Sequence, residues 1–164
     1  MSASNAGAWA AVLAIMGCVA ACKHTAAPPP SPPQQVETGS TFTLLAPLTF
    51  PNGRSELLFQ GQRQVNADAL ARNLPYCKLV PQAGAPRALV PGSFRVGSVT
   101  YDERESGDSN AMLSITRITL VPGANLPGYT MSCGWPAATS GPAFLTTEQI
   151  YNALGGQFSM QLLR

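Results

Sequence analysis

Most of the chain after residue 40 consists of short stretches in which apolar and polar residues alternate. The alternation is clearest in residues 128–133 (GYTMSC) and 157–163 (QFSMQLL). A period of two is typical of a strand that buries one face and exposes the other. We therefore expect two strands here. Their core-facing residues would be Tyr129, Met131 and Cys133 in the first and Phe158, Met160 and Leu162 in the second.

Two pairs of β-like stretches are expected to form hairpins. The first pair, residues 42–50 (FTLLAPLTF) and 55–65 (SELLFQGQRQV), flanks the turn sequence PNG at 51–53. Asn and Gly tolerate positive φ, which makes this a strong turn signal. The second pair is residues 93–102 (SFRVGSVTYD) and 111–121 (AMLSITRITLV), on either side of the polar loop ERESGDSN.

The region between the hairpins predicts three further features. Residues 66–72 could form one short helix with Asn66 as its N-cap, since Asn is a preferred N-cap residue. Residues 76–80 are typical of another strand. Residues 81–91 contain mainly Pro, Gly and Ala and are expected to form a loop.

Near the C-terminus the sequence predicts a helix over residues 147–154. Thr146 and Gln149 have the spacing of a capping box, and Gly155-Gly156 supplies the glycine expected after the last turn. The residues expected to pack against the rest of the domain are Ile150, Tyr151 and Leu154.

These elements together predict one mainly β domain. We count six to eight short strands and one or two short helices, which favours a small β-sandwich or a partly open barrel. The 164 residues suit one domain, and 15 Gly with 15 Pro favour short strands and many turns. The net charge is only +2 and the basic residues are scattered, so no basic stripe for nucleic acid is evident.

The N-terminal segment has a different character. Residues 1–21 carry no charged side chain, and residues 8–21 (AWAAVLAIMGCVAA) are apolar and rich in small residues. A membrane-spanning helix needs about 20 predominantly apolar residues, which is more than this run provides. A cleavable export signal is favoured over a buried core helix or an uncleaved membrane anchor.

The end of this segment, Val19-Ala20-Ala21-Cys22, resembles the lipobox of bacterial lipoproteins. The resemblance implies that Cys22 receives a diacylglycerol, that the signal (1–21) is cut before it, and that the new amino group is acylated. Residues 15–18 (IMGC) match less well because Met16 is bulky. The start MSASNAGAW lacks the Lys or Arg usual in such signals. Either basic residues lie upstream of this start, or the signal is atypical.

Residues 22–40 are expected to be the lipidated cysteine and a tether. Lys23 suits a position among lipid phosphates, and because it is not Asp the resemblance implies the outer membrane. The run PPPSPP favours polyproline II, a semi-rigid spacer of about 3.1 Å per residue. A ligand for a proline-recognising domain is an alternative interpretation. Residues 41–164 would then be a periplasmic β domain.

The expected state of the cysteines follows from this assignment. If Cys18 leaves with the signal and Cys22 carries lipid, Cys77 and Cys133 remain in the domain. An exported domain lies in an oxidising compartment, so we expect the two to form a disulfide. Two buried free thiols are the alternative. A metal site is disfavoured because CxxC spacing and partner histidines are absent from the sequence.

The sequence holds few candidates for catalysis. His24, the only histidine, lies in the tether, which argues against a Ser-His-Asp or Cys-His site in the domain. The acidic cluster at 102–108 has Arg104 where a calcium loop needs an oxygen ligand, and a solvated hairpin loop is favoured. Glu56 and Asp102 are a carboxylate pair that could flank a glycosidic bond.

Trp135, in the sequence CGWP, has two interpretations. It could be an exposed anchor for a ligand, or it could pack on the nearby disulfide and core, which is favoured.

We therefore expect an outer-membrane lipoprotein, anchored by palmitate-type acyl chains, whose periplasmic domain binds or scaffolds another cell-envelope component. The partner would be an envelope protein or peptidoglycan. The alternatives are a carboxylate-dependent enzyme acting on peptidoglycan or another glycan, and a purely structural surface lipoprotein. No cofactor or metal is expected.

Overall fold

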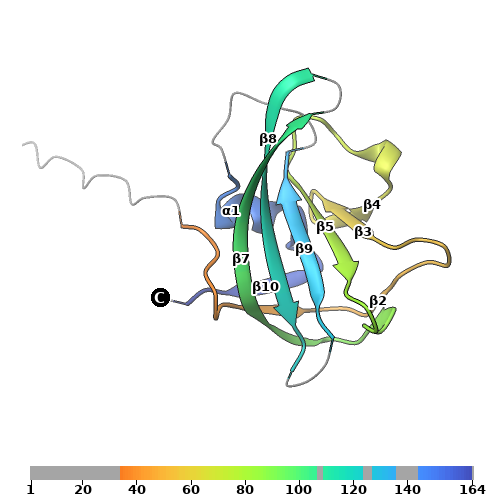
Figure 1. Ribbon diagram of the computed structural model, residues 1–164. Coiled ribbons are helices and arrows are strands. Elements are labelled where there is room, and N and C mark those ends of the chain that lie inside the picture. Colours follow the sequence, from red (N-terminus) through yellow and green to blue (C-terminus); the bar gives the residue numbers. More distant parts are fainter. Residues whose placement is uncertain (1–33, 107–108, 124–126, 136–143, 164) are drawn as a thin grey trace, which may run out of the picture. The chain divides into compact units, whose positions relative to one another are not determined.

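The computed structural model describes residues 34–106, 109–123, 127–135 and 144–163 (Figure 1). The predicted export signal and most of the predicted tether lie outside them. The elements are β1 (Thr41–Leu44), β2 (Leu48–Thr49), β3 (Leu57–Gln60), β4 (Arg63–Val65), a 3-10 helix (Ala67–Ala69), β5 (Tyr76–Pro81), β6 (Ala88–Leu89), β7 (Gly92–Ser106), β8 (Ser109–Val121), β9 (Tyr129–Gly134), α1 (Thr147–Leu154) and β10 (Phe158–Gln161).

The fold is mainly β, and the class predicted from sequence is confirmed. Eight strands form one antiparallel sheet in the order β10-β1-β7-β8-β9-β5-β3-β4, which curls into a half-barrel around α1 (Figure 1). The short strands β2 and β6 form a second, two-stranded sheet. These two bring the strands of the described residues to ten, against the six to eight expected. No helix among the described residues is long and apolar enough to cross a membrane.

The second predicted hairpin is confirmed and is longer than expected. Strands β7 and β8 pair antiparallel from Arg95↔Val121 to Ser106↔Ser109, with a bulge between Val96 and Ser98. They include most of the stretch expected to be a polar loop.

The first predicted hairpin is wrong, although its turn forms. Gly53 has φ +80°, but the residues on either side of the turn do not pair with each other. Strand β1 pairs with β7 and β10, whereas β3 pairs with β4 and β5. The hairpin in this region turns instead at Gly61 and Gln62, which have φ +59° and +66°. Two consecutive positive φ values define the two-residue turn that matches strand twist.

The two ends of the curled sheet are joined by side chains. Phe59 on β3 and Phe158 on β10 meet edge to face, with their ring centroids 6.1 Å apart. Helix α1 packs against β3, β5 and β10 and buries Ile150, Ala153 and Leu154. The helix and the two phenylalanines fill the space between the ends of the sheet. The barrel is therefore closed by side-chain packing, whereas its backbone hydrogen bonding does not continue all the way round.

Helix α1 begins as predicted and differs at its packing face. The Thr146 hydroxyl accepts the Gln149 N–H, and the Gln149 side chain accepts the Thr146 N–H, so the capping box is complete. Tyr151, expected to pack inward, is 44% exposed. Ala153 is buried instead, since its spacing from Ile150 places both on one face of the helix together with Leu154.

A close approach follows the helix. The Gln62 N–H donates to the Ala153 carbonyl over 3.1 Å, so the β3–β4 turn lies against the end of α1. A Cβ added to Gly156 would come within 2.2 Å of the Gln62 oxygen. Glycine is therefore needed at this position for contact between backbones, and not for a positive φ.

An aromatic cluster fills the end of the core covered by β2 and β6. The Tyr129 ring is parallel to that of Phe50, with 6.4 Å between the ring centroids. It meets the Phe94 ring edge to face, with 5.8 Å between the centroids. Its hydroxyl donates to the Pro86 carbonyl over 2.8 Å, and burial raises the pKa of this phenol above its ordinary value.

Cys77 and Cys133 form the predicted disulfide. They are directly opposite each other on β5 and β9, with Cα atoms 4.1 Å apart, and both are fully buried. Tyr129, Met131 and Cys133 share the buried face of β9, as the alternation predicted. Phe158 is likewise buried on β10, while Met160 is only partly covered.

We expect Cys77→Ser, Cys133→Ser and the double variant to lower the melting temperature to a similar extent. The bridge closes a loop of sequence separation 56, and losing such a bond from a small exported domain costs about 2–5 kcal/mol. Thermal unfolding of the four oxidised proteins tests this. Additive losses in the double variant would show that each cysteine contributes through packing alone.

Candidate functional site

A groove lies where the segments before β3 and after β4 diverge. Its volume is about 570 Å³, and it is lined by residues 53–58 on one side and 64–68 on the other. Leu57 and Leu58 are almost fully buried at its base, whereas its rim is polar. We call it the β4 groove.

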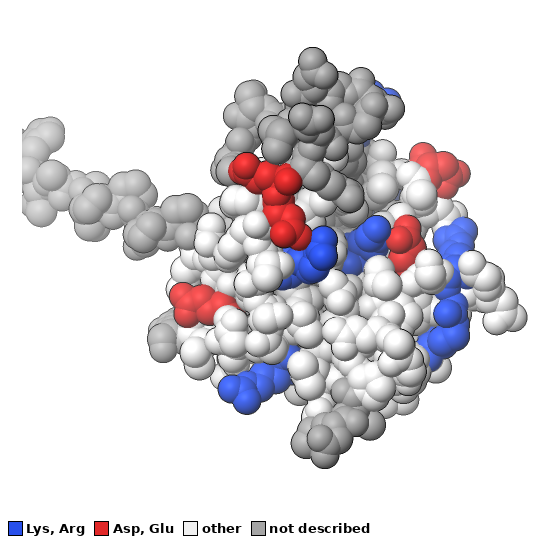
Figure 2. Space-filling model, viewed as in Figure 1, with Lys and Arg blue, Asp and Glu red and all other residues white. Residues whose placement is uncertain are grey.

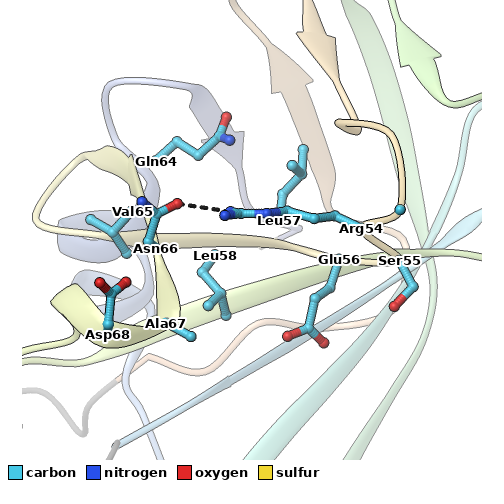
Figure 3. A pocket seen from close by; sticks show the side chains of 11 residues that line it. Arg54, Ser55, Glu56, Leu57, Leu58, Gln64, Val65, Asn66, Ala67 and Asp68 are labelled. Carbon is cyan, nitrogen blue, oxygen red and sulfur yellow. Dashed lines mark hydrogen bonds between the residues drawn. The ribbon is translucent and has the colours of Figure 1, made fainter.

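Arg54 spans the β4 groove. Its Nη1 donates to Asn66 Oδ1 over 2.7 Å, which links the two sides of the groove (Figure 3). Asn66 was expected to cap a helix over 66–72, but only the 3-10 turn Ala67–Ala69 forms and the Asn66 side chain caps nothing. Its side chain is committed to Arg54 instead.

Two carboxylates lie on one side of this link. Glu56 and Asp68 lie below the Arg54–Asn66 bond in Figure 3, and Gln64 lies above it. Glu56 forms an ion pair with Lys78 on β5, with 3.2 Å between Nζ and Oε2. Both side chains are more than a third exposed, so this pair contributes little to stability.

A second groove also borders β4. It measures about 350 Å³ and is lined by Arg63, Gln64, Val65, Asn66 and Ala69. Both grooves therefore share residues 64–66. Strand β4 is the last strand of the large sheet, and no other strand of the described residues pairs with its outer edge.

Gln60 holds the chain that follows the 3-10 turn. Its side chain is buried, donates to the carbonyls of Ala71 and Leu74 over 3.0 Å, and accepts the Ala71 N–H over 2.8 Å. This one amide fixes the loop 70–75 beside the β3–β4 hairpin.

The carboxylates Glu56 and Asp102 are not brought together. Asp102 on β7 forms an ion pair with Arg117 on β8, with 2.9 Å between Oδ2 and Nη2, whereas Glu56 lies just before β3. Strands β8, β9 and β5 lie between, and adjacent strands are about 4.8 Å apart. Glycosidic cleavage by two carboxylates requires about 5–9.5 Å, so this particular pair does not fit.

Trp135 is half-buried and packs against the hydrophobic core, as its favoured interpretation predicted. Its Nε1 atom and the buried Thr116 Oγ1 find no hydrogen-bond partner among the described residues. Tyr101 on β7, which is opposite Thr116, packs against Phe144 with 5.0 Å between their ring centroids. Burial, and secondarily the Glu37 carboxylate, raise the pKa of Tyr101 above its ordinary value.

The other predicted positions divide between the two regions of the chain. Cys22, Lys23 and His24 lie outside the described residues. In the acidic stretch 102–108, residues 102–106 belong to β7, and 107 and 108 are not described. Among the described residues, no three His, Cys, Asp or Glu side chains cluster as metal ligands would.

Sequence reasoning missed the β4 groove. The signal that could have found it is the tight turn at Gly61, which would have placed a hairpin between β3 and β4 and left Asn66 at its open end. Compared with protein-family models, with curated proteins and with solved structures, the chain matches none.

We expect Gln60→Leu to destabilise the domain by about 2–4 kcal/mol, because it leaves three backbone groups of Ala71 and Leu74 without their partner. Gln64→Leu, at an exposed position of the neighbouring strand, is the control and should change stability by less than about 0.5 kcal/mol. Urea unfolding measures both. Equal effects would mean that Gln60 does not hold the loop.

Proposed function

We propose that this protein is an outer-membrane lipoprotein whose periplasmic β domain binds another cell-envelope component through the β4 groove. The observation that carries the anchoring is the sequence Val19-Ala20-Ala21-Cys22 followed by a proline-rich spacer. A buried disulfide supports export, since such bonds persist in oxidising compartments.

The position of the groove supports a binding role. The described chain begins at Gln34, whose carbonyl accepts the backbone N–H and the hydroxyl of Thr147 at the start of α1. In Figure 1 this point lies on the left of the domain, and β3 and β4 lie on the right. A partner could therefore occupy the groove without meeting the point from which the tether leaves.

The chemistry of the groove also supports binding. Its base is apolar, and its rim presents a guanidinium, amides and carboxylates. Ligand sites combine an apolar surface with a few placed polar groups that fix orientation. The volume is within the range of about 300–1,000 Å³ found for ligand pockets.

One observation favours the enzymatic alternative. Glu56 and Asp68 both line the β4 groove, so two carboxylates do share one concave site. Glycan hydrolysis would need one of them to remain protonated near neutral pH. Glu56 is already held in an ion pair with the Lys78 ammonium, so it is not free to act as a catalytic group, and binding is the better-supported role.

We expect Cys22→Ser to remain unprocessed and unlipidated, since the hydroxyl replaces the thiol that would receive the lipid. Radiolabelled palmitate and membrane fractionation of cells carrying each form measure this. Cys18→Ser is the matched control and should still incorporate label. Label in the Cys22 variant, or a mature N-terminus elsewhere, would refute the anchor.

We expect a photo-crosslinking residue placed at Asp68, in the β4 groove, to capture one defined envelope component in living cells. The same residue at Gln161, exposed on β10 at the other end of the sheet, is the control and should not capture it. Mass spectrometry of the crosslinked product identifies the component. Equal capture at both positions would show that the groove is not the binding surface.

A further inference from the structure

Within the part of the chain that the structure describes, β4 pairs with β3 on one edge and with no strand on its other edge. Gln60 and Arg63 flank the two-residue turn, so they form the hydrogen-bonded pair that closes the hairpin. Hydrogen bonding alternates along an antiparallel strand, and Arg63 and Val65 therefore face β3. Gln64 must direct its N–H and carbonyl away from the sheet.

The edge continues one residue beyond β4. Asn66 is extended, with φ −90° and ψ 160°, so its N–H points the same way as that of Gln64. Its carbonyl accepts the Ala69 N–H over 3.0 Å and is already used. The free groups are the N–H and carbonyl of Gln64 and the N–H of Asn66. They are spaced as they would be for a further strand.

Open edges usually carry protection against pairing with other chains, such as a covering loop, a bulge or a proline. Here Gln64, Val65 and Asn66 line both grooves. No proline occurs from residue 52 to residue 74. The edge of β4 is therefore accessible to an extended chain.

The charged side chains near this edge carry a net positive charge, because the Glu56 carboxylate at the groove is paired with Lys78. Arg54, Arg63 and Arg87 form no ion pair within the described part of the chain. Arg87 Nη2 donates to the Arg54 carbonyl, so these two residues are adjacent. Asp68 is the opposing charge at the groove. Figure 2 shows basic side chains along the right-hand edge, the side on which β2, β3 and β4 lie in Figure 1, with one acidic side chain above them.

We propose that an extended acidic segment of an envelope protein binds by adding a strand to the free edge of β4. This inference rests on the proposed function and specifies its partner class. Main-chain pairing at Gln64 and Asn66 supplies attachment, and the cations select acidic side chains. A second copy of this chain fits less well, because pairing two β4 edges would bring Arg54 and Arg63 of each copy together.

Proline substitution isolates the backbone contribution. Gln64→Pro removes the outward N–H and leaves the ladder with β3 intact, because only Arg63 and Val65 bond to β3. Proline also requires an extended residue before it, and Arg63 is in a strand. Gln64→Ala is the matched control, since both variants lose the amide side chain and only proline loses the N–H.

The probe is a fluorescent peptide of about eight residues with blocked ends and alternating Thr and Glu, within the usual length of a strand. The same peptide with Lys in place of Glu is its control. Fluorescence anisotropy measures binding to the full chain in mild detergent. Arg63→Glu tests the charge, and Arg95→Glu, exposed on β7 at the other side of the sheet, is its control.

We expect the Glu peptide to bind and the Lys peptide not to bind. Gln64→Pro should weaken binding about tenfold relative to Gln64→Ala, the effect of one lost hydrogen bond and a ring at the contact. Arg63→Glu should weaken it by a similar factor and Arg95→Glu should not. Circular dichroism and melting temperature confirm that each variant is folded.

Three outcomes would overturn the inference: equal binding by Gln64→Pro and Gln64→Ala, equal binding of the two peptides, or a dimer in sedimentation that Gln64→Pro dissociates. The component crosslinked at Asp68 separates this test from that of the proposed function. If Gln64→Pro still captures that component in cells, the binding function stands and strand addition is wrong. If the protein with the crosslinker at Asp68 and with Gln64 unchanged captures no component, the proposed binding function is wrong.

Discussion

The interior of this domain is held together by contact between the two ends of one curled sheet. Phe59 on β3 meets Phe158 on β10 across the core, and α1 packs on both strands. A closed barrel would satisfy its edge strands by hydrogen bonding all the way round. Here apolar packing replaces the last part of that ladder, and at the β4 end Gln64 directs backbone groups away from the sheet.

The geometry of this contact determines where the candidate site lies. The β3–β4 turn must lie against the end of α1, and it does so through the Gln62–Ala153 hydrogen bond and the absence of a side chain at Gly156. Fixing the turn also fixes the direction of β4. The strand then diverges from the segment before β3, and Arg54 bridges the resulting groove to Asn66. The site is thus a direct consequence of how the barrel closes.

The disulfide stabilises a different part of the same structure. It joins β5 to β9 in the middle of the sheet and on its buried face, so it strengthens a pairing that already exists. On the opposite face of these strands, Lys78 and Arg117 flank Ser132 in one row and hold Glu56 and Asp102. Glu56 and Asp102, the candidate catalytic carboxylates of the sequence, are therefore each held in an ion pair on this face. Arg54 and Arg63, which line the grooves beside β4, form no ion pair within the described part of the chain.

The sequence by itself determined the features that depend on near neighbours in the chain. The alternation of apolar and polar residues predicted the buried face of β9, and the Thr146–Gln149 spacing predicted the start of α1. Both signals are local, because the pleat of a strand and the cap of a helix involve only a few consecutive residues. The Cys77–Cys133 pairing followed from counting the cysteines that an exported domain would retain. The partners of β1 and β3 could not be predicted in this way. A turn at Asn52-Gly53 is compatible with a hairpin, yet burial of Phe42 and Phe59 in one core was satisfied by pairing β1 with β7 and β10. Only the tertiary structure decided that Tyr151 faces outward and that β4 ends the sheet with its edge uncovered. Both depend on which distant surfaces compete for the same buried space.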